Sequence, residues 1–243
     1  MIIDAHSHVH DPPDAHLALL DQAGVDKAIL FPTRPHPERA TDLASLRRQA
    51  DVLQRALAGG DDEGCERARG EWEAALAAHP DRFIGFGSFA DAENLRGIGE
   101  LTPPPDRAEE IEPYLRLAVD HGCVPVVVHG AAPTTVRDLG TLTALARRYP
   151  NVPLVVSQLG GAHWMDAIEL VRDTPNMYLE LSTASLVLSV RLAIQEIPER
   201  TLFGSDAPYG DPVLAHATVE RVTRPGELRD LVLGGTAVRL VGL

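Results

Sequence analysis

The chain has few cysteines and aromatic residues, and it has no apolar run long enough to cross a membrane. Two cysteines, Cys65 and Cys123, occur in 243 residues. They are too few for a disulfide framework and too far apart for a Cys-x-x-Cys metal site, so we expect free thiols. The first residues, MIIDAHSHVH, lack the basic and apolar regions of a signal peptide. These absences predict a cytoplasmic protein that does not span a membrane.

Positive charge is also scarce. The chain has 22 Lys and Arg against 35 Asp and Glu, which gives a net charge of −13. Such a chain repels phosphate backbones and anionic lipid surfaces as a whole, which disfavours nucleic acid and membranes as partners. We therefore expect a small-molecule substrate, and a homo-oligomer stays possible. With 44% hydrophobic residues, the chain can bury a large core, and we predict a single domain over residues 1–243.

Short apolar segments alternate with helix-like segments along the chain. The predicted strands are 2–6, 28–31, 83–89, 97–101, 124–129, 154–158, 177–181 and 201–205. The predicted helices include 15–23, 109–120, 136–149, 164–172 and 186–197, and one or two more are expected in 226–243. Eight alternations, with several strands apolar on both faces, predict an α/β fold of the (β/α)8 TIM-barrel type.

Two places depart from a regular barrel. Only residues 90–96 separate the third and fourth predicted strands, which is too short for a crossover helix and leaves the barrel distorted or one strand misassigned. Residues 32–80, after the second strand, contain two predicted helices, 40–58 and 66–78, joined by an acidic, glycine-rich loop. We interpret 32–80 as a helical insertion, with a lid or side subdomain as the alternative.

The motif His6-Ser7-His8 follows the first apolar residues. If residues 2–8 form a strand, the alternation of side chains places Asp4, His6 and His8 on one side. Two imidazoles would then converge on one point, as a metal ion requires. Neutral imidazole suits zinc, iron, nickel or cobalt, and a catalytic site leaves one coordination position open for water or substrate.

Polar side chains end most of the predicted strands. They are His6, His8, Glu100, His129, Gln158 and Asp206. Each could be an ordinary residue at a strand end. In a parallel barrel, however, the carboxyl ends of all strands meet at one rim, where the active site lies. Their joint occurrence therefore predicts a metal site at that rim.

Six segments together resemble a known family. They are IDAHSH at 3–8, RFIG at 82–85, PVVVH at 125–129, LGG at 159–161, NMYLELS at 176–182 and LFGSDAP at 202–208. In this order they resemble the amidohydrolase superfamily, and within it the amidohydrolase-related branch that includes aminocarboxymuconate-semialdehyde decarboxylase-like proteins. The resemblance implies a (β/α)8 barrel with a divalent metal ion, foremost zinc (Zn), with manganese (Mn) or iron (Fe) as alternatives.

The resemblance also implies the ligands. It suggests His6, His8, His129 and Asp206 as metal ligands. Glu100 is similar to the bridging glutamate of TatD-type hydrolases, which would admit a second metal ion.

One position departs from the family pattern. Gln158 stands where these proteins usually have a histidine that binds metal or polarises the substrate. Glutamine donates hydrogen bonds but exchanges no proton near neutral pH. His163, in the loop that follows, is the candidate to take over that role.

The leading hypothesis is metal-dependent hydrolysis of an amide, lactone or related carbonyl bond through a metal-activated water. Asp206 would accept the proton from this water, and Gln158 would donate a hydrogen bond to the developing oxyanion. Trp164, Ser182, Thr183 and Tyr209 are candidates for the pocket wall.

Other functions stay open. One alternative is non-oxidative decarboxylation of a small unsaturated or aromatic acid. Its anionic substrate would need a cation such as Arg34 or Arg137. A nuclease of the TatD type is disfavoured by the net charge and by Gln158. Another alternative is a catalytically degenerate barrel that only binds a ligand, because the substitution at Gln158 falls on a usual catalytic position.

Overall fold

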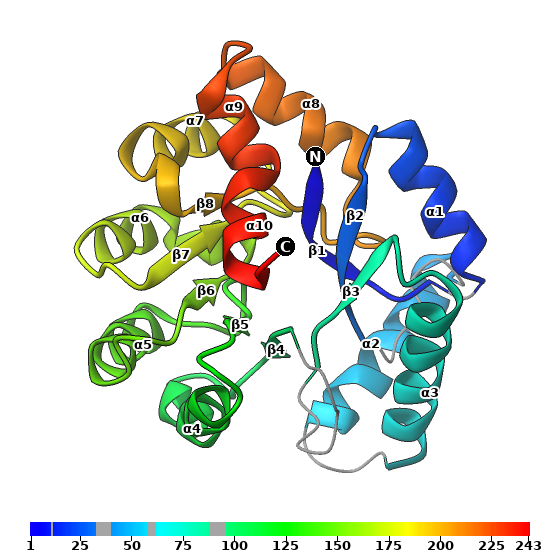
Figure 1. The fold of residues 1–243 in the computed structure, drawn as a ribbon. Helices are drawn as coiled ribbons and strands as arrows, with labels where there is room; N and C mark the ends of the chain where they lie inside the picture. Colours follow the sequence, from blue (N-terminus) through cyan, green and yellow to red (C-terminus); the bar gives the residue numbers. More distant parts are fainter. Residues whose placement is uncertain (11, 33–39, 58–61, 88–95) are drawn as a thin grey trace.

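The computed structural model of the protein describes residues 1–10, 12–32, 40–57, 62–87 and 96–243. Within these residues, eight strands alternate with helices around a common centre (Figure 1). The strands are β1 (Ile3–His8), β2 (Lys27–Phe31), β3 (Phe83–Gly85), β4 (Ile98–Leu101), β5 (Val126–Val128), β6 (Leu154–Val156), β7 (Met177–Glu180) and β8 (Thr201–Leu202). Neighbouring strands pair in parallel in two sheets, ordered β1-β2-β3 and β4-β5-β6-β7-β8.

Backbone hydrogen bonds outside the strand ladders join the two sheets. Ala5 N in β1 donates to Phe203 O after β8 over 2.9 Å. Gly97 O, before β4, accepts from Gly87 N, after β3, over 3.4 Å. The predicted (β/α)8 TIM barrel is therefore confirmed. The predicted gap at residues 90–96 lies almost entirely outside the described residues.

The helices lie around the outside of the barrel, except α10, which lies over one end of it (Figure 1). They are α1 (Pro13–Gln22), α2 (Leu43–Leu57), α3 (Asp62–Ala78), α4 (Glu112–Asp120), α5 (Val136–Arg148), α6 (Trp164–Arg172), α7 (Val187–Glu196), α8 (Pro212–Val222), α9 (Glu227–Asp230) and α10 (Thr236–Val241). Helices α2 and α3 lie in the segment 32–80, which stays a predicted insertion; α3 begins at Asp62, four residues before the predicted helix, and residues 58–61 lie outside the described residues. Helix α8 was not predicted. Among the described helices, none is both long and apolar enough to cross a membrane.

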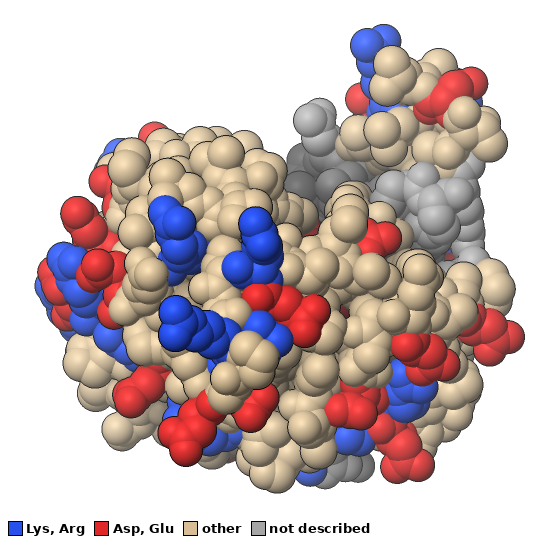
Figure 2. All heavy atoms as spheres, turned by 90° about the horizontal axis from the view of Figure 1, so that it is seen from above, with Lys and Arg blue, Asp and Glu red and all other residues tan. Residues whose placement is uncertain are grey.

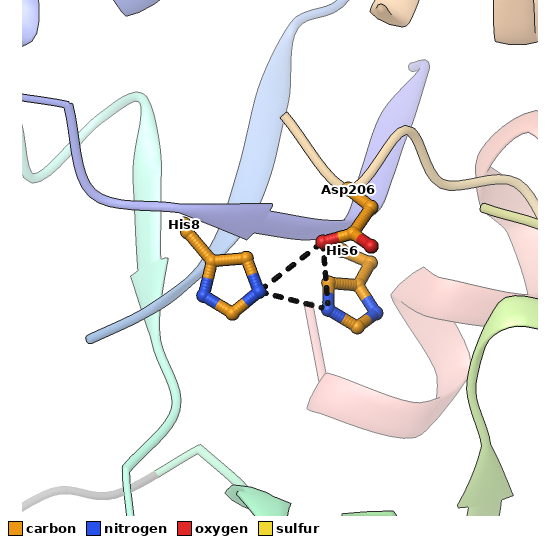
Figure 3. A group of neighbouring side chains, drawn as sticks. All are labelled: His6, His8 and Asp206. Carbon is orange, nitrogen blue, oxygen red and sulfur yellow. Dashed lines mark hydrogen bonds and ion pairs between the residues drawn. The ribbon is translucent and has the colours of Figure 1, made fainter. Parts of the chain in front are cut away.

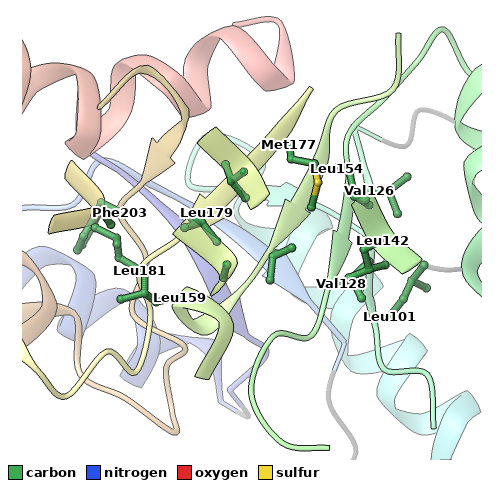
Figure 4. Close-up of a cluster of buried hydrophobic side chains, with 14 of the residues drawn as sticks. Leu101, Val126, Val128, Leu142, Leu154, Leu159, Met177, Leu179, Leu181 and Phe203 are labelled. Atoms are coloured by element: carbon green, nitrogen blue, oxygen red, sulfur yellow. The ribbon is translucent and has the colours of Figure 1, made fainter. Parts of the chain in front are cut away.

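Apolar side chains pack in two layers. The larger layer, between the strands and the outer helices, includes Val126 and Leu154 from the strands and Leu142 from α5 (Figure 4). The smaller layer fills the barrel, where Ile3 and Ile29 pack with Val241 of α10. Each buried side chain of this size contributes about 1.5–3 kcal/mol. Because the interior is packed and α10 lies over one end, the barrel is a core and not a pore.

Strand β1 contains a bulge. The three steps from Asp4 to Ser7 on β1 face only two steps on β2, so one extra residue reverses the alternation of sides. The ring centroids of His6 and His8 lie 4.9 and 5.9 Å from the ring centroid of Phe31, a residue of the barrel interior. The Asp4 carboxylate instead accepts a hydrogen bond from Ser7 Oγ. The prediction that Asp4 shares a side with the two histidines is therefore wrong.

Charges on the surface are mixed. On the face that Figure 2 shows, Lys and Arg side chains are interspersed with Asp and Glu. Arg137, a predicted partner for an anionic substrate, is exposed on α5, and Arg34 lies outside the described residues. Cys123 is a free, half-buried thiol, as expected.

Candidate metal centre

His6, His8 and Asp206 converge at the carboxyl end of the barrel (Figure 3). The two histidine Nε2 atoms are 3.3 Å apart. Asp206 Oδ1 lies 3.2 Å from Nε2 of His8 and 3.6 Å from Nε2 of His6. All three residues are buried, and one ligand atom of each lies within 4.8 Å of the others. In the part of the chain that the structure describes, this is the one group with the spacing of a metal site.

The backbone of Asp206 holds its side chain beside His6. Asp206 has a φ of 60°, in the left-handed region that few residues other than glycine adopt. Its N–H donates to His6 O over 2.7 Å, which ties the chain after β8 to β1. This bond joins two ligand candidates that are 200 positions apart in the sequence.

Glu180 orients the imidazole of His6. His6 Nδ1 lies 3.1 Å from Oε2 of Glu180, the last residue of β7. The buried carboxylate also accepts hydrogen bonds from Ser182 Oγ over 2.7 Å and from Gln158 N over 3.2 Å. Because an ionised carboxylate only accepts, Nδ1 carries a proton, and in the neutral imidazole the lone pair of Nε2 is left for a metal ion. A carboxylate behind a histidine in this way is typical of metal-binding histidines.

Sequence reasoning missed Glu180. The predicted strand 177–181 placed Glu180 inside the strand, whereas β7 ends at that residue. Glu100 and Asp206 were found because each is a carboxylate at the end of a predicted strand. Glu180 fits the same pattern, but the predicted strand 177–181 ran one residue past it.

Glu100 lies at the edge of the group, and His129 lies behind it. Glu100 Oε2 is 3.6 Å from Nε2 of His6 and 3.8 Å from that of His8. The other oxygen, Oε1, is 3.0 Å from Nδ1 of His129. His129 Nε2 faces Ala132 O over 3.1 Å, and a carbonyl oxygen only accepts, so this nitrogen carries a proton. The ligand role predicted for His129 would require its ring to leave Ala132, and it stays a prediction.

Gln158 links the end of β5 to Asp206. Its Oε1 accepts from the N–H groups of Gly130 and Ala131 over 3.3 and 3.1 Å, which fixes the orientation of the amide. Its Nε2 then donates to Asp206 Oδ2 over 3.1 Å. His163, half-buried just before α6, has no hydrogen bond or ion pair with the three ligand candidates among the residues described.

The two carboxylates of the group, Glu100 and Asp206, favour a positive charge beside them. Burial lowers the pKa of His6, but the negative charges of Glu100 and Asp206 outweigh it and hold that pKa well above its ordinary value. Burial raises the pKa of Glu100, yet the positive charge of His6 and the hydrogen bond from His129 bring it well below its usual range. The pKa of Asp206 is lowered against burial by His6 and His8. Protonated His6 thus supplies the positive charge that a metal ion would otherwise provide.

The donor set fits a divalent metal ion. Asp206 Oδ1 is buried and accepts no hydrogen bond of good geometry from the described residues. The Nε2 atoms of His6 and His8 face the same point. Two imidazole nitrogens with one or two carboxylate oxygens are a ligand set of Zn²⁺, Mn²⁺ and Fe²⁺ sites.

The predicted wall residues differ in their surroundings. Tyr209 is 46% exposed, and its ring meets that of His8 edge-on, with the centroids 5.6 Å apart. Ser182 is fully buried and holds Glu180 instead. Trp164 packs against the apolar layer outside the strands. Of these three residues, Tyr209 is the one whose ring meets that of a ligand candidate.

Comparison with solved structures shows the same fold along the whole chain. A 5-carboxyvanillate decarboxylase from Sphingomonas paucimobilis is 17% identical, with a TM-score of 0.66 over 100% of this chain and 99% of the other. A dihydroxybenzoic acid decarboxylase from Polaromonas sp. JS666, with bound manganese and the inhibitor 2-nitroresorcinol, is 16% identical, with a TM-score of 0.66 over 100% and 97%. An amidohydrolase from Burkholderia multivorans with bound zinc is 17% identical, with a TM-score of 0.60 over 100% and 99%.

No curated protein matches the sequence. The sequence profile of the family described as Amidohydrolase matches residues 3–243. This match covers nearly the whole chain and includes β1, with His6 and His8, and the segment after β8, with Asp206. The chain therefore belongs to the amidohydrolase family.

Proposed function

We propose that the chain is a divalent-metal-dependent enzyme that removes the carboxyl group of a small aromatic or unsaturated acid without oxidation. The observation that carries the proposal is the convergence of His6, His8 and Asp206 at the carboxyl end of the barrel. The similarity to decarboxylases of 5-carboxyvanillate and dihydroxybenzoic acid supports this reaction. It favours decarboxylation over the hydrolysis that we expected from the sequence.

The residues of the group have separate tasks in this proposal. His6, His8 and Asp206 would hold the metal ion, with Glu100 as a further oxygen ligand. When bound, the ion would act as a Lewis acid toward an oxygen of the substrate. Glu180 keeps the proton of His6 on Nδ1, and Gln158 holds Asp206 Oδ2.

The contacts of Asp206 favour decarboxylation for a second reason. Hydrolysis needs a base that takes a proton from water and returns it to the leaving group. Oδ2 of Asp206 is occupied by the Gln158 amide, and Oδ1 faces the two histidines. Gln158 itself exchanges no proton near neutral pH. A reaction with a single proton delivery therefore suits this site better than one with two transfers.

Decarboxylation breaks one carbon–carbon bond, releases CO₂ and places one proton on the carbon that carried the carboxylate. The proton has to come from a group at the site. Among the described residues His129 is the candidate, because the lowered pKa of Asp206 leaves that carboxylate without a proton to give. His129 stands at the side of Glu100 away from His6 and is partly exposed, so it can exchange protons with solvent.

The test is product analysis in D₂O. The protein is loaded separately with Zn²⁺ and Mn²⁺ and is assayed with two sets of compounds. The first set contains hydroxybenzoates and unsaturated acids, and the second contains amides and lactones. We expect CO₂ release and one deuterium on the former carboxyl carbon of an acid substrate. The His6→Ala/His8→Ala double variant is the control for contaminating enzymes. Cleavage of an amide or lactone without CO₂ release from any acid would overturn the proposal.

A further inference from the structure

The candidate metal centre lies at the seam between the first and last strands. His6 comes from β1 and Asp206 from the segment after β8. Between these segments the structure has an isolated bridge at Ser7 and Ala207 in place of a regular ladder. A few backbone hydrogen bonds therefore join the two segments. Additional contacts across the seam have a direct effect on the spacing of the ligands.

Asp4 makes such contacts from both sides of the seam. Its carboxylate is fully buried. Oδ1 accepts from His6 N over 3.1 Å and from Ser205 N over 2.9 Å. Oδ2 accepts from Ser7 Oγ over 2.9 Å and from Ser205 Oγ over 2.5 Å. Two of the four hydrogen bonds come from the β1 bulge, and two come from the residue immediately before Asp206.

The bulge explains why a carboxylate is needed there. The extra residue in β1 takes backbone groups out of register with β2, and His6 N donates to the Asp4 side chain. Buried backbone groups need a partner, and a buried carboxylate needs several donors to offset its lost hydration. Asp4 meets both needs and at the same time binds Ser205. The bulge that turns His6 into the barrel is thus fastened to the segment that presents Asp206.

We propose that Asp4 is a positioning residue of the metal centre: by holding the β1 bulge and Ser205 together, it sets the distance between the ligand atoms of His6 and Asp206. Asp4 contacts neither the substrate nor the metal ion. The inference rests on the metal site of the proposed function, but not on the reaction that the site performs.

Measuring the metal affinity tests the positioning role of Asp4 without an activity assay. The dissociation constant for Zn²⁺ is measured by competition with a chromophoric chelator, and the geometry of the site by the absorption spectrum of bound Co²⁺. We expect Asp4→Ala to weaken Zn²⁺ binding about 10- to 100-fold, as for other residues behind metal ligands. Asp4→Asn keeps the shape and two acceptor contacts, so its loss is expected to be smaller. Both variants are expected to change the Co²⁺ spectrum.

Asp138 provides a matched control. It is also a buried aspartate, and its carboxylate accepts from the N–H groups of Asp106, Ala108 and Thr135, away from the metal centre. Asp138→Asn should lower the melting temperature without changing Zn²⁺ affinity or the Co²⁺ spectrum. This comparison separates a loss of stability from a loss of ligand geometry.

A milder variant covers the case in which Asp4→Ala does not fold. Ser205→Ala removes one hydroxyl and its 2.5 Å contact with Asp4. We expect weaker Zn²⁺ binding in the same direction as for Asp4→Asn. Wild-type affinity and an unchanged Co²⁺ spectrum in folded Asp4→Asn and Ser205→Ala would overturn the inference. Wild-type protein that binds no metal would overturn the metal centre as well, whereas absent CO₂ release would affect only the proposed reaction.

Discussion

The side-chain amide of Gln158 donates to Asp206 Oδ2 over 3.1 Å, and its orientation is fixed by two backbone N–H groups at its other end. Gln158 therefore works as a connector between the end of β5 and a candidate metal ligand. The hydrogen bond to a developing oxyanion, which the sequence suggested for Gln158, would compete with this contact. A histidine could not accept from both backbone N–H groups in the same way.

Replacing Gln158 by a residue of similar size without polar atoms should affect both ends of this connection. In Gln158→Leu, the N–H group of Ala131 loses its acceptor, that of Gly130 keeps only Ser157 Oγ, and Asp206 loses a donor. We expect the free energy of unfolding to fall by about 1–3 kcal/mol, the cost of unsatisfied buried groups. Turnover should fall as well. Chemical denaturation and product assays check both effects, and unchanged stability would mean that water replaces the glutamine.

Glu180 should control the strength of metal binding through His6. In Glu180→Gln, Nδ1 of His6 faces an amide in place of a carboxylate, which makes the imidazole a weaker donor to the metal. We expect an affinity loss of about 10- to 100-fold, measured by isothermal titration calorimetry. Glu112→Gln is the control, because Glu112 accepts a hydrogen bond from Arg116 at the surface. The metal affinity of this variant should equal that of the wild type. Equal affinities in both variants would contradict the role of Glu180.

His129→Gln distinguishes the two roles open to that residue. If His129 supplies a proton, the variant should retain its metal content and lose turnover at least about 10-fold, as expected for a general acid. If His129 is a ligand, as the resemblance implies, elemental analysis should find less metal in the variant. We expect the first result, because both ring nitrogens are already occupied by Glu100 and Ala132.

Metal content reports directly on the number of ions. Protein purified without chelator should contain about one equivalent of a transition metal, and the His6→Ala/His8→Ala variant should contain none. About two equivalents would indicate that Glu100 bridges a second ion. No metal in the wild type, and none taken up from added Zn²⁺ or Mn²⁺, would favour a barrel that only binds a ligand.

Asp138 should make stability depend on acidity. Burial raises its pKa, but hydrogen bonds from the backbone N–H groups of Thr135, Asp106 and Ala108 bring it below the ordinary value of 3.8. Its stabilising contribution is therefore present above pH 3.8 and is lost as pH falls through the lowered value. The difference in unfolding free energy between wild type and Asp138→Asn, about 1 kcal/mol at neutral pH, should shrink below pH 3.8. A constant difference would contradict this.

The sequence predicted the barrel and the place of the site because both depend on periodic patterns. Alternating apolar and helical segments predict the strands, and strand-end residues mark the rim where His6, His8 and Asp206 meet. The bulge in β1 could not be predicted, because it shows in the pairing with β2 and not in the composition of β1. Strict alternation therefore placed Asp4 on the wrong side.

The contacts behind the ligands were also beyond the sequence. The partner of His6 Nδ1 is Glu180, and the distance between them depends on the packing of β7 beside β8. The position of His129 depends on the turn that carries Ala132 O, which no residue pattern specifies. The contact between His6 and Glu180 joins strands far apart in the chain, and only the closed barrel brings them together.

The seam between β1 and β8 also has a consequence for folding. A metal ion held by His6 and Asp206 would act as a removable cross-link between the two ends of the chain. Such a link closes a loop of nearly the full chain length and can form only when the last strand has docked. Unfolding would have to release the ion first, so stability should rise with free metal concentration according to the affinity. The His6→Ala/His8→Ala variant should show no such dependence.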